Sequence, residues 1–487
     1  MRHSAKILAL LLLLTMAAIL VQGYHPGLED DAYYLAAIKH DLNPALFPHD
    51  AEFFQVLFQA TVFDKLIAAS LRLTQLPLGW GIFLWQFAAT FLILWGCWRI
   101  ALRCFEEEYA QWAAVTMVAV LLTLPVSGSG LLLTDQHLQP RSLATALILA
   151  AIVAVLDGRN LLAGGLLLAA FPLHLNMTPF GVSYCVFLGW KPQRKTQPSL
   201  TPAAAVLAFP LQWIFEPAND TWRQAEATRN FYFLLRWHWY EWLGIVGPLV
   251  LLWWFRRLAL AHGSAVLARV SERAVYFGIF QFAVALILML PPRLERFRSF
   301  EPMRFLHLIY LLFVLLAGGL LARYVLKRSV VRWLLLFVPL SAGMFYAQRQ
   351  LYPATAHLEL PGVPSHNAWV EAFRWISHNT PVDSYFALDP DYIEMPGNDA
   401  HGFRALAERS VLADAIKDPC IVVRVPSLGP RWLHEMNAQQ GWRSFHREDF
   451  LRLRQQFGVN WAVVPSPGVT GMTCPYNKGS LAVCRVE

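Results

Sequence analysis

Charged residues are scarce in this sequence of 487 residues. Lys, Arg, Asp and Glu make up 15% of it, whereas a soluble globular domain carries about a quarter. Hydrophobic residues account for 56% and gather in long blocks. This pattern excludes a chain that folds entirely in water and makes lipid the expected solvent for much of it. The net charge of +7 does not indicate a nucleic-acid partner, because the basic residues lie in short loops, where they orient membrane helices.

Cysteine motifs for zinc and redox chemistry are missing as well. The six cysteines include no CxxC pair, and their spacing to histidines does not match a zinc site. Cys97, Cys104 and Cys185 lie in or beside apolar segments, which is typical of buried structural residues. Internal repeats and low-complexity tracts are also lacking.

Eleven apolar blocks predict about eleven transmembrane helices. They are residues 7–21, 79–102, 111–133, 142–156, 161–174, 178–190, 202–216, 240–255, 274–291, 305–322 and 332–347. The first block follows a basic stretch, as in a signal peptide, but Gln22-Gly23-Tyr24 is a poor cleavage site. We therefore interpret it as an uncleaved helix with a cytoplasmic N-terminus.

Basic loops predict how the helices are oriented. Segment 161–190 is either one long helix or two short ones. With two, the basic loops 191–195, 256–273 and 323–332 all fall on the cytoplasmic side, in agreement with the positive-inside rule. A single helix would place all three outside, so we expect two. The odd total then brings the C-terminus to the outer side.

The chain changes character after the last apolar block. Helical patterns alternate there with short β-like runs, which predicts a small α/β domain. The helical patterns are residues 367–378 and 447–457, and the β-like runs are 384–388, 420–425, 461–464 and 481–486. The expected fold is a polytopic α-helical membrane protein of about 11 transmembrane helices (1–349), followed by a small C-terminal extracytoplasmic α/β domain (350–487).

The outer loop at 23–78 is the longest between the apolar blocks. Its residues 51–73 have apolar side chains at helical spacing, interrupted by charges that are too frequent for a spanning helix. This pattern predicts a helix that lies in the membrane interface.

Three consecutive carboxylates stand in this loop, close to the outer end of the first helix. Glu29, Asp30 and Asp31 lie where an unpaired charge is costly. Adjacent like charges raise one another's pKa, which suits a general base. The sequence is equally compatible with Asp30 or Asp31 as the N-cap of a helix that follows.

Further candidates lie in the next outer loops. His137 and Arg141 stand beside a helix start, where Arg141 suits either a lipid phosphate or snorkelling to headgroups. His174, between two apolar segments, either faces a cavity or is a buried, hydrogen-bonded residue. Arg229 lies among aromatic residues that suit either stacking on sugar rings or an interfacial belt.

Arginines crowd the outer loop at 292–304. Four of them stand there with Glu295 and Glu301, against the positive-inside trend. Binding of an anion is one explanation, and pairing with acidic residues is another. Arg304, at the start of the next helix, is our preferred phosphate ligand.

Two cysteines of the C-terminal domain are predicted to pair. Cys474 and Cys484 lie in the part expected outside the membrane, where disulfides persist. They flank a strand–turn stretch around Asn477. Cys420 would then be left free.

The acidic first outer loop, the many membrane helices and the outer α/β domain together resemble the GT-C superfamily of membrane glycosyltransferases. The resemblance covers the whole chain in architecture. It is closer still to a family of uncharacterised bacterial polytopic membrane proteins that share the Glu29-Asp30-Asp31 loop and an Asn-Pro-x-Leu-Phe element, here residues 43–47. The resemblance to the GT-C enzymes implies a polyprenyl-phosphate-linked sugar as donor, and a loop carboxylate that acts as base or binds a metal.

The resulting hypothesis is a glycosyltransferase at the outer face of the bacterial inner membrane. Arg304 or Arg141 would bind the donor phosphate, and Asp30 or Asp31 would deprotonate an unidentified acceptor. The carboxylates also suit a divalent metal, although one short cluster does not make a complete site. A transporter or lipid flippase is the main alternative, but charges within the apolar blocks are too few to favour it. A non-catalytic assembly protein with the same scaffold is the third.

Reporter fusions test the expected topology. A fusion at Arg194, Arg257 or Lys327 should give a cytoplasmic signal, and one at Asp414 an external signal, because the basic loops set the orientation. An external signal at Arg257, or a cytoplasmic one at Asp414, would contradict the prediction.

Overall fold

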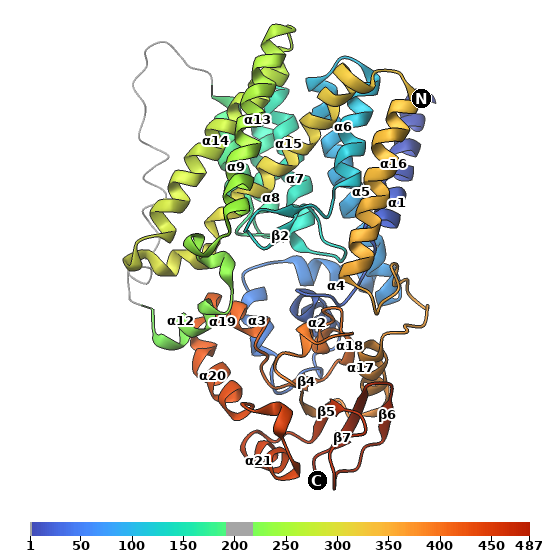
Figure 1. Ribbon diagram of the computed structural model, residues 1–487, viewed down its shortest axis with the longest axis vertical. Coiled ribbons are helices and arrows are strands. Elements are labelled where there is room, and N and C mark those ends of the chain that lie inside the picture. Colours follow the sequence, from blue (N-terminus) through green and yellow to red (C-terminus); the bar gives the residue numbers. More distant parts are fainter. Residues whose placement is uncertain (1, 191–217) are drawn as a thin grey trace.

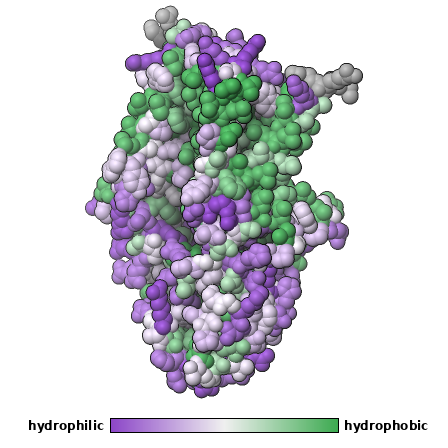
Figure 2. Space-filling view, turned by 45° about the vertical axis from the view of Figure 1, so that its right-hand side comes forward, coloured by the Kyte–Doolittle hydropathy of each residue, from purple (hydrophilic) through white to green (hydrophobic). Residues whose placement is uncertain are grey.

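The computed structural model describes residues 2–190 and 218–487. Helices fill one half of the molecule and a mixed helix–sheet unit fills the other, with the N- and C-termini at opposite ends of the long axis (Figure 1). The surface of the helical half is largely hydrophobic, whereas that of the mixed half is largely hydrophilic (Figure 2). This division matches a chain that is solvated partly by lipid.

The helical half contains ten described helices. They are α1 (Arg2–Gln22), α5 (Leu78–Cys104), α6 (Glu108–Val120), α7 (Pro140–Leu156), α8 (Asn160–Ala170), α9 (Thr178–Gly189), α13 (Trp239–Ala261), α14 (Ala265–Met289), α15 (Phe305–Leu321) and α16 (Val330–Leu351). Within the described part of the chain, six of them are long and apolar enough to cross a membrane, namely α1, α5, α13, α14, α15 with its flanks, and α16. The chain is therefore a membrane protein. Most of α15 is buried, which makes it the central helix.

The eleven expected spans stay a prediction. The block 202–216 lies outside the described residues. Segment 161–190 forms the two helices α8 and α9, as the charge pattern indicated. With 11 residues, α8 reaches only about 16 Å along a hydrocarbon core of about 30 Å.

One predicted helix is wrong over half of its length. The block 111–133 is helical only as α6, and a hairpin of β1 (Pro125–Val126) and β2 (Leu131–Leu132) follows. Pro125 lacks a backbone N–H and disfavours helix in the residue before it, which ends the helical run. The turn of the hairpin contains Gly128, at φ +57°. A Cβ at this position would overlap the indole of Trp237, so the turn requires glycine.

Loops at the end of the helical half away from the C-terminus are tied to one another. Arg103 at the end of α5 pairs with Asp157 after α7. Arg323 after α15 pairs with Glu107 at 3.1 Å and donates to Ser264 at 2.8 Å. The basic loops 256–273 and 323–332 therefore share one end with the start of α1 (Figure 1). The third basic loop, 191–195, lies outside the described residues.

A five-stranded sheet forms the centre of the mixed half, in the order β4–β3–β5–β7–β6. The strands are β3 (Tyr385–Ala387), β4 (Ser410–Val411), β5 (Trp461–Pro465), β6 (Tyr476–Lys478) and β7 (Leu481–Arg485). Strand β3 is parallel to β4 and β5, and β7 is antiparallel to β5 and β6. Alternate residues of β3, β5 and β7 bury against α17 (Ala368–Asn379) on one face and α21 (Arg447–Phe457) on the other.

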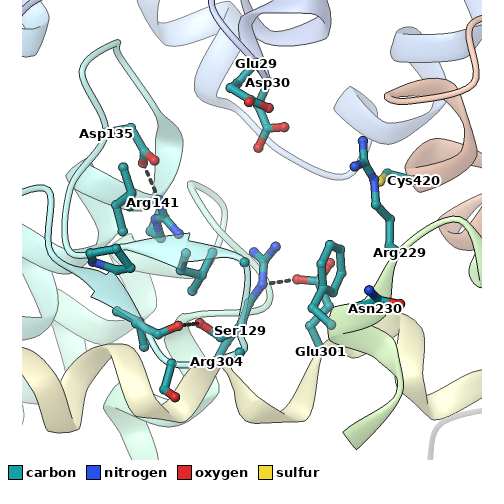
Figure 3. Close-up of a pocket in the computed structure, with 18 of the residues that line it drawn as sticks. Glu29, Asp30, Ser129, Asp135, Arg141, Arg229, Asn230, Glu301, Arg304 and Cys420 are labelled. Atoms are coloured by element: carbon teal, nitrogen blue, oxygen red, sulfur yellow. Dashed lines mark hydrogen bonds and ion pairs between the residues drawn. The ribbon is translucent and has the colours of Figure 1, made fainter. Parts of the chain in front are cut away.

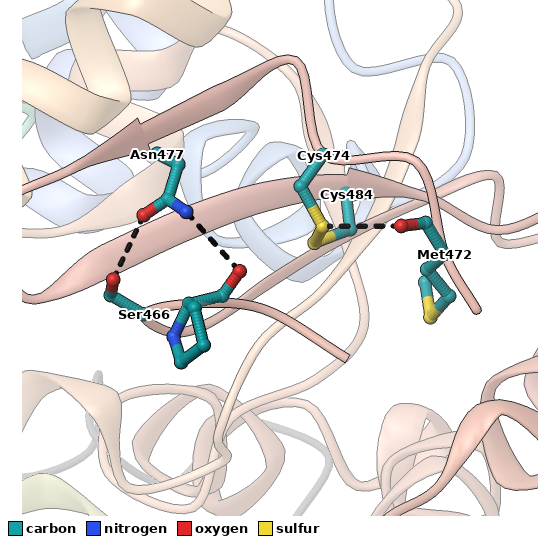
Figure 4. Close-up of a disulfide and its surroundings, with 6 residues drawn as sticks. Ser466, Met472, Cys474, Asn477 and Cys484 are labelled. Atoms are coloured by element: carbon teal, nitrogen blue, oxygen red, sulfur yellow. Dashed lines mark hydrogen bonds between the residues drawn. A yellow bond between two sulfur atoms is a disulfide. The ribbon is translucent and has the colours of Figure 1, made fainter. Parts of the chain in front are cut away.

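A disulfide joins Cys474, which precedes β6, to Cys484 in β7 (Figure 4). Asn477 bridges the same region, because its side chain bonds with the Ser466 hydroxyl at 2.8 Å and the Pro467 carbonyl at 3.2 Å. Cys420 is free. The disulfide and these two hydrogen bonds stabilise the edge of the sheet that β7 and β6 form.

The strand predicted at 420–425 is wrong. This segment is helix α19 (Asp418–Arg424). Its run of β-branched residues is typical of strands, but Pro419 in the first turn suits a helix start. Ile421 and Val422 are fully buried in an apolar core between the two halves of the molecule, so tertiary packing outweighs the local propensity.

The first outer loop lies between the two halves and joins them. It forms α2 (Asp31–Leu42), α3 (Glu52–Phe58) and α4 (Phe63–Thr74), so the single helix expected at 51–73 is in fact two. These helices share an apolar core with α12 (Asp220–Ala227), α19 and α20 (Gly429–Ala438). The two parts that the sequence divides at residue 349 thus have a common interior.

A buried arginine reinforces this junction. Arg404, in α18 (Phe403–Ala407), is 3% exposed. It donates to Asp50 of the first loop at 2.6 Å and to both oxygens of Asp418 at 2.8 and 3.0 Å. Two buried carboxylates thus share one guanidinium within the protein.

Arg404→Met should destabilise the protein by about 3–5 kcal/mol, because it leaves two buried carboxylates without a partner. Thermal unfolding of the purified protein measures this as a lowered Tm. Arg452→Met is the matched control, since Arg452 pairs with Asp449 at the surface and its removal should cost about 0–1 kcal/mol. Similar losses in both variants would contradict the role given to Arg404.

Candidate functional site

A cavity of about 960 Å³ lies where the helical and mixed halves meet. Its walls come from the start of α2, the β1–β2 hairpin, the starts of α7 and α13, the segment before α15, and α19. Figure 3 shows Glu29 and Asp30 on one side of this space and Arg141 and Arg304 across from them. The cavity thus brings together charged residues that are far apart in the sequence.

Glu29 and Asp30 form the acidic side of the cavity. Both carboxylates contact the ammonium of Lys417, which lies 3.0 Å from Asp30 Oδ1. Burial opposes ionisation of Asp30, but Lys417 and a hydrogen bond from Tyr33 outweigh it and hold the pKa of Asp30 well below its usual range. The Asp30 side chain is still 32% exposed, so an ionised carboxylate is accessible from the cavity.

Asp31 points elsewhere and is 2% exposed. It accepts a hydrogen bond from the backbone N–H of Gly27 at 2.8 Å, and it does not line the cavity. Burial raises the pKa of Asp31 to about 6. Asp30 stands at the N-cap position of α2, but its side chain makes no capping hydrogen bond. The geometry therefore leaves Glu29 and Asp30 for chemistry and gives Asp31 a structural role.

Three guanidinium groups form the opposite side. Arg141 pairs with Asp135, while Arg304 and Arg424 share Glu301, which lies 2.8 Å from Arg424. Three positive charges against two negative ones leave one positive charge uncompensated. The Nε atoms of Arg141 and Arg424 are buried and have no hydrogen-bond partner among the described residues. This side is therefore suited to bind an anion.

His174 shows the effect of these charges. It lies in the break between α8 and α9 and lines the cavity. Burial, together with the positive charges of Arg304, Arg141 and Arg424, keeps its pKa well below the usual value. Its Nδ1 accepts a hydrogen bond from the Met177 backbone N–H at 3.2 Å. His174 is therefore a neutral, half-buried imidazole that faces the cavity.

The other expected residues lie around the same space. His137 lines the cavity, and its Nε2 is 3.0 Å from the side-chain nitrogen of Gln139. Arg229 lines it beside Cys420 (Figure 3) and donates to the backbone carbonyl of Ile416. Aromatic side chains complete this wall, including Phe231, Trp237 and Tyr240. Stacking on a sugar ring is compatible with such a surface.

The arginine loop is only partly involved. Of its four arginines, Arg304 alone lines the cavity. Arg298 pairs with Glu226 at 3.0 Å, and Glu295 pairs with Arg223 at 2.9 Å. Pairing with an acidic residue, one of the two explanations offered for these arginines, thus accounts for Arg298.

Sequence analysis missed the wall formed by α19 and the turn before it. Lys417, Cys420 and Arg424 all line the cavity. Their spacing of three and four residues places them on one face of a helix. This helical spacing could have identified the three residues, but it was overlooked because 420–425 was predicted to be a strand.

Comparisons with known proteins do not assign the chain to a family. No protein-family model matches the sequence, and a search of the curated proteins finds no match either. The function must therefore be inferred from the contacts and charges of the cavity.

Asp31→Asn should change how stability depends on pH. A pKa raised to about 6 in the folded state means that protonated Asp31 stabilises the fold at low pH, and that this contribution is lost between about pH 4 and pH 6. The free energy of unfolding of the neutral variant should therefore increase relative to that of the wild type as the pH rises, by at most about 3 kcal/mol. Melting curves from about pH 4 to pH 8 measure the difference. A difference in Tm that is constant with pH would show that Asp31 stays ionised in the fold.

Proposed function

We propose that the protein is a GT-C-like glycosyltransferase, which transfers a sugar from a polyprenyl phosphate to an acceptor hydroxyl. The observation that carries this proposal is the cavity with Glu29 and Asp30 on one side and three arginines on the other. A transferase of this kind needs a base for the acceptor and a cationic site for the phosphate. The cavity offers both at the boundary between the apolar and polar halves.

The donor phosphate would bind to Arg141, Arg304 and Arg424. A sugar linked to a lipid through one phosphate is a phosphodiester with a single negative charge. It would balance the one positive charge left by the three arginines and the carboxylates of Asp135 and Glu301. The unpaired Nε atoms of Arg141 and Arg424 supply donors for its oxygens.

A polyprenyl chain would lie along the apolar surface at the start of α13. Leu235, Trp239 and Leu243 are all more than half exposed there. Tyr240 and Gly244 of the same segment line the cavity. Lipid and headgroup would thus meet where a polar cavity adjoins a hydrophobic surface, and membrane lipid itself would cover the rest of this surface.

Asp30 would act as the base. It would take the proton of the acceptor hydroxyl while the acceptor oxygen forms a bond to the anomeric carbon. The bond between that carbon and the phosphate oxygen breaks, and the leaving phosphate keeps the electron pair. Its added negative charge would be stabilised by the arginines. Lys417 keeps Asp30 deprotonated before the reaction, but by lowering the pKa of Asp30 it also weakens this carboxylate as a proton acceptor, contrary to the rise expected from adjacent carboxylates. The assignment of the base therefore rests on the position of Asp30 at the cavity wall.

We further infer a bacterial inner-membrane protein with eleven membrane helices. The described basic loops and the start of α1 share one end of the helical half. The positive-inside rule makes this end cytoplasmic. The cavity and the mixed half would then face the periplasm. A charged cavity at one end of the helical half suits a transferase, whereas a flippase needs access from both faces of the membrane.

The experiment combines binding with turnover. Full-length protein should bind undecaprenyl phosphate, detected by native mass spectrometry, and should bind undecaprenol much more weakly, because only the phosphate meets the arginines. Arg304→Gln should weaken phosphate-lipid binding by at least about tenfold, the equivalent of one lost charge-assisted hydrogen bond. Asp30→Asn should keep binding and abolish sugar transfer from a radiolabelled polyprenyl-phosphate sugar to an endogenous acceptor in membranes.

Each variant leaves the neighbouring charges paired. Glu301 keeps Arg424 in Arg304→Gln, and Lys417 keeps Glu29 in Asp30→Asn. Arg298→Gln is the matched control, since Arg298 belongs to the same loop and pairs with Glu226 away from the cavity. Unchanged transfer in Asp30→Asn would refute its role as base. Binding without transfer in the wild type would point to a non-catalytic protein with a lipid site.

A further inference from the structure

The acidic motif of the cavity already contains a cation that belongs to the protein. Lys417 Nζ donates to Asp30 Oδ1 over 3.0 Å and also contacts the carboxylate of Glu29. The Lys417 side chain is 7% exposed, so the ammonium is enclosed rather than held at the surface. A divalent metal would need the same oxygens, at about 2.0–2.6 Å. It would then stand directly against the charge of the ammonium.

The backbone that carries Lys417 is fixed by a buried network. Asp414 accepts from the backbone N–H groups of Ile416, at 2.8 Å, and of Lys417. Asp418 accepts from the backbone N–H of Asp414 at 2.9 Å and is itself held by both terminal nitrogens of Arg404. The turn before α19 therefore cannot withdraw Lys417 without breaking these bonds.

The carboxylates are fixed from their own side. Glu29 adopts a left-handed backbone conformation with φ +49°, which is uncommon for a residue other than glycine. Its backbone N–H donates to the Ala400 carbonyl at 2.8 Å, which ties the motif to the mixed half. Both partners of the ion pair are thus preorganised, so little entropy is lost in holding them together.

The residues present do not fit a resident metal. Among the described residues, no group of three or more His, Cys, Asp or Glu side chains is arranged to hold one. The third carboxylate of the motif, Asp31, is turned away toward Gly27. Burial disfavours the charged form of Lys417, but Asp30 and Glu29 outweigh it and raise its pKa above the usual value. The ammonium is therefore permanent at physiological pH, unlike a lysine that could give way to a metal.

We propose that Lys417 is the resident cation of the acidic motif. Its ammonium takes the place between Glu29 and Asp30 that a divalent metal would take, and it positions the Asp30 carboxylate at the cavity wall. The proposed transfer then needs no metal. This last statement rests on the proposed function, whereas the occupancy of the motif by Lys417 does not.

Metal-dependent thermal stability tests the occupancy directly. The Tm of the full-length protein in detergent should be unchanged by EDTA and by millimolar MgCl₂ or MnCl₂, because the site between the carboxylates is filled. Lys417→Met removes the cation and leaves two adjacent carboxylates, so its Tm should rise with added Mn²⁺ as binding stabilises the fold. The triple variant with Glu29→Gln and Asp30→Asn should lose that rise. Lys417→Arg should behave as the wild type does.

The wild-type measurement decides the question even where Lys417→Met fails to fold. A rise of the wild-type Tm with Mn²⁺ that Glu29→Gln removes would overturn the proposal. A folded Lys417→Met that does not respond to Mn²⁺ would overturn it as well.

Activity supplies a second and separate measurement. Transfer by the wild type should persist in EDTA. In Lys417→Met the acid limb of the pH–rate profile should move to higher pH, since the pKa of Asp30 rises without its partner, and Lys417→Arg should restore it. A wild type that shows no transfer would sink the proposed function, while the Tm results would stand unchanged.

Discussion

Neutralisation of buried charge at the junction of the two halves is the constraint on which the rest of the structure depends. The loop at 23–78 carries carboxylates into this junction, and three of them meet a cation from the mixed half. Arg404 meets Asp50, and Lys417 meets Glu29 and Asp30. A buried charge without its partner costs several kcal/mol. The two halves are therefore one unit energetically, although composition divides them clearly.

The same requirement gives the cavity its character. Arg304 and Arg424 share Glu301, so the cationic side is held in place by fewer carboxylates than it has guanidinium groups. His174 stays neutral beside them. A surplus of one positive charge is tolerated where an anion completes the set. The cationic side of the cavity is thus electrostatically complementary to a singly charged anion.

The sequence predicts features that extend over whole segments of this fold better than it predicts local changes of secondary structure. Apolar blocks and loop charges indicated the helical half and the two helices at 161–190, because lipid burial acts on whole segments. Short β-like runs at 461–464 and 481–486 indicated strands. The break after Val120 and the helix at 418–424 were missed, since Pro125 and Pro419 act locally against strong apolar runs. Charges in the loops next to apolar blocks indicated four residues of the cavity, namely Glu29, Asp30, Arg141 and Arg304. Lys417 and Arg424 were not indicated, because nothing near them in sequence marks their partners, which lie 387 and 388 residues earlier for Lys417 and 123 residues earlier for Arg424.

That distance along the chain has a consequence for biosynthesis. The cavity wall includes Glu29, made among the first residues, and Arg424, made among the last. Translation must therefore proceed beyond Arg424 before the wall can close. A nascent or truncated chain holds its acidic loop without Lys417 and has no complete site. The complete cavity can thus form only in molecules that contain both the loop at 23–78 and helix α19.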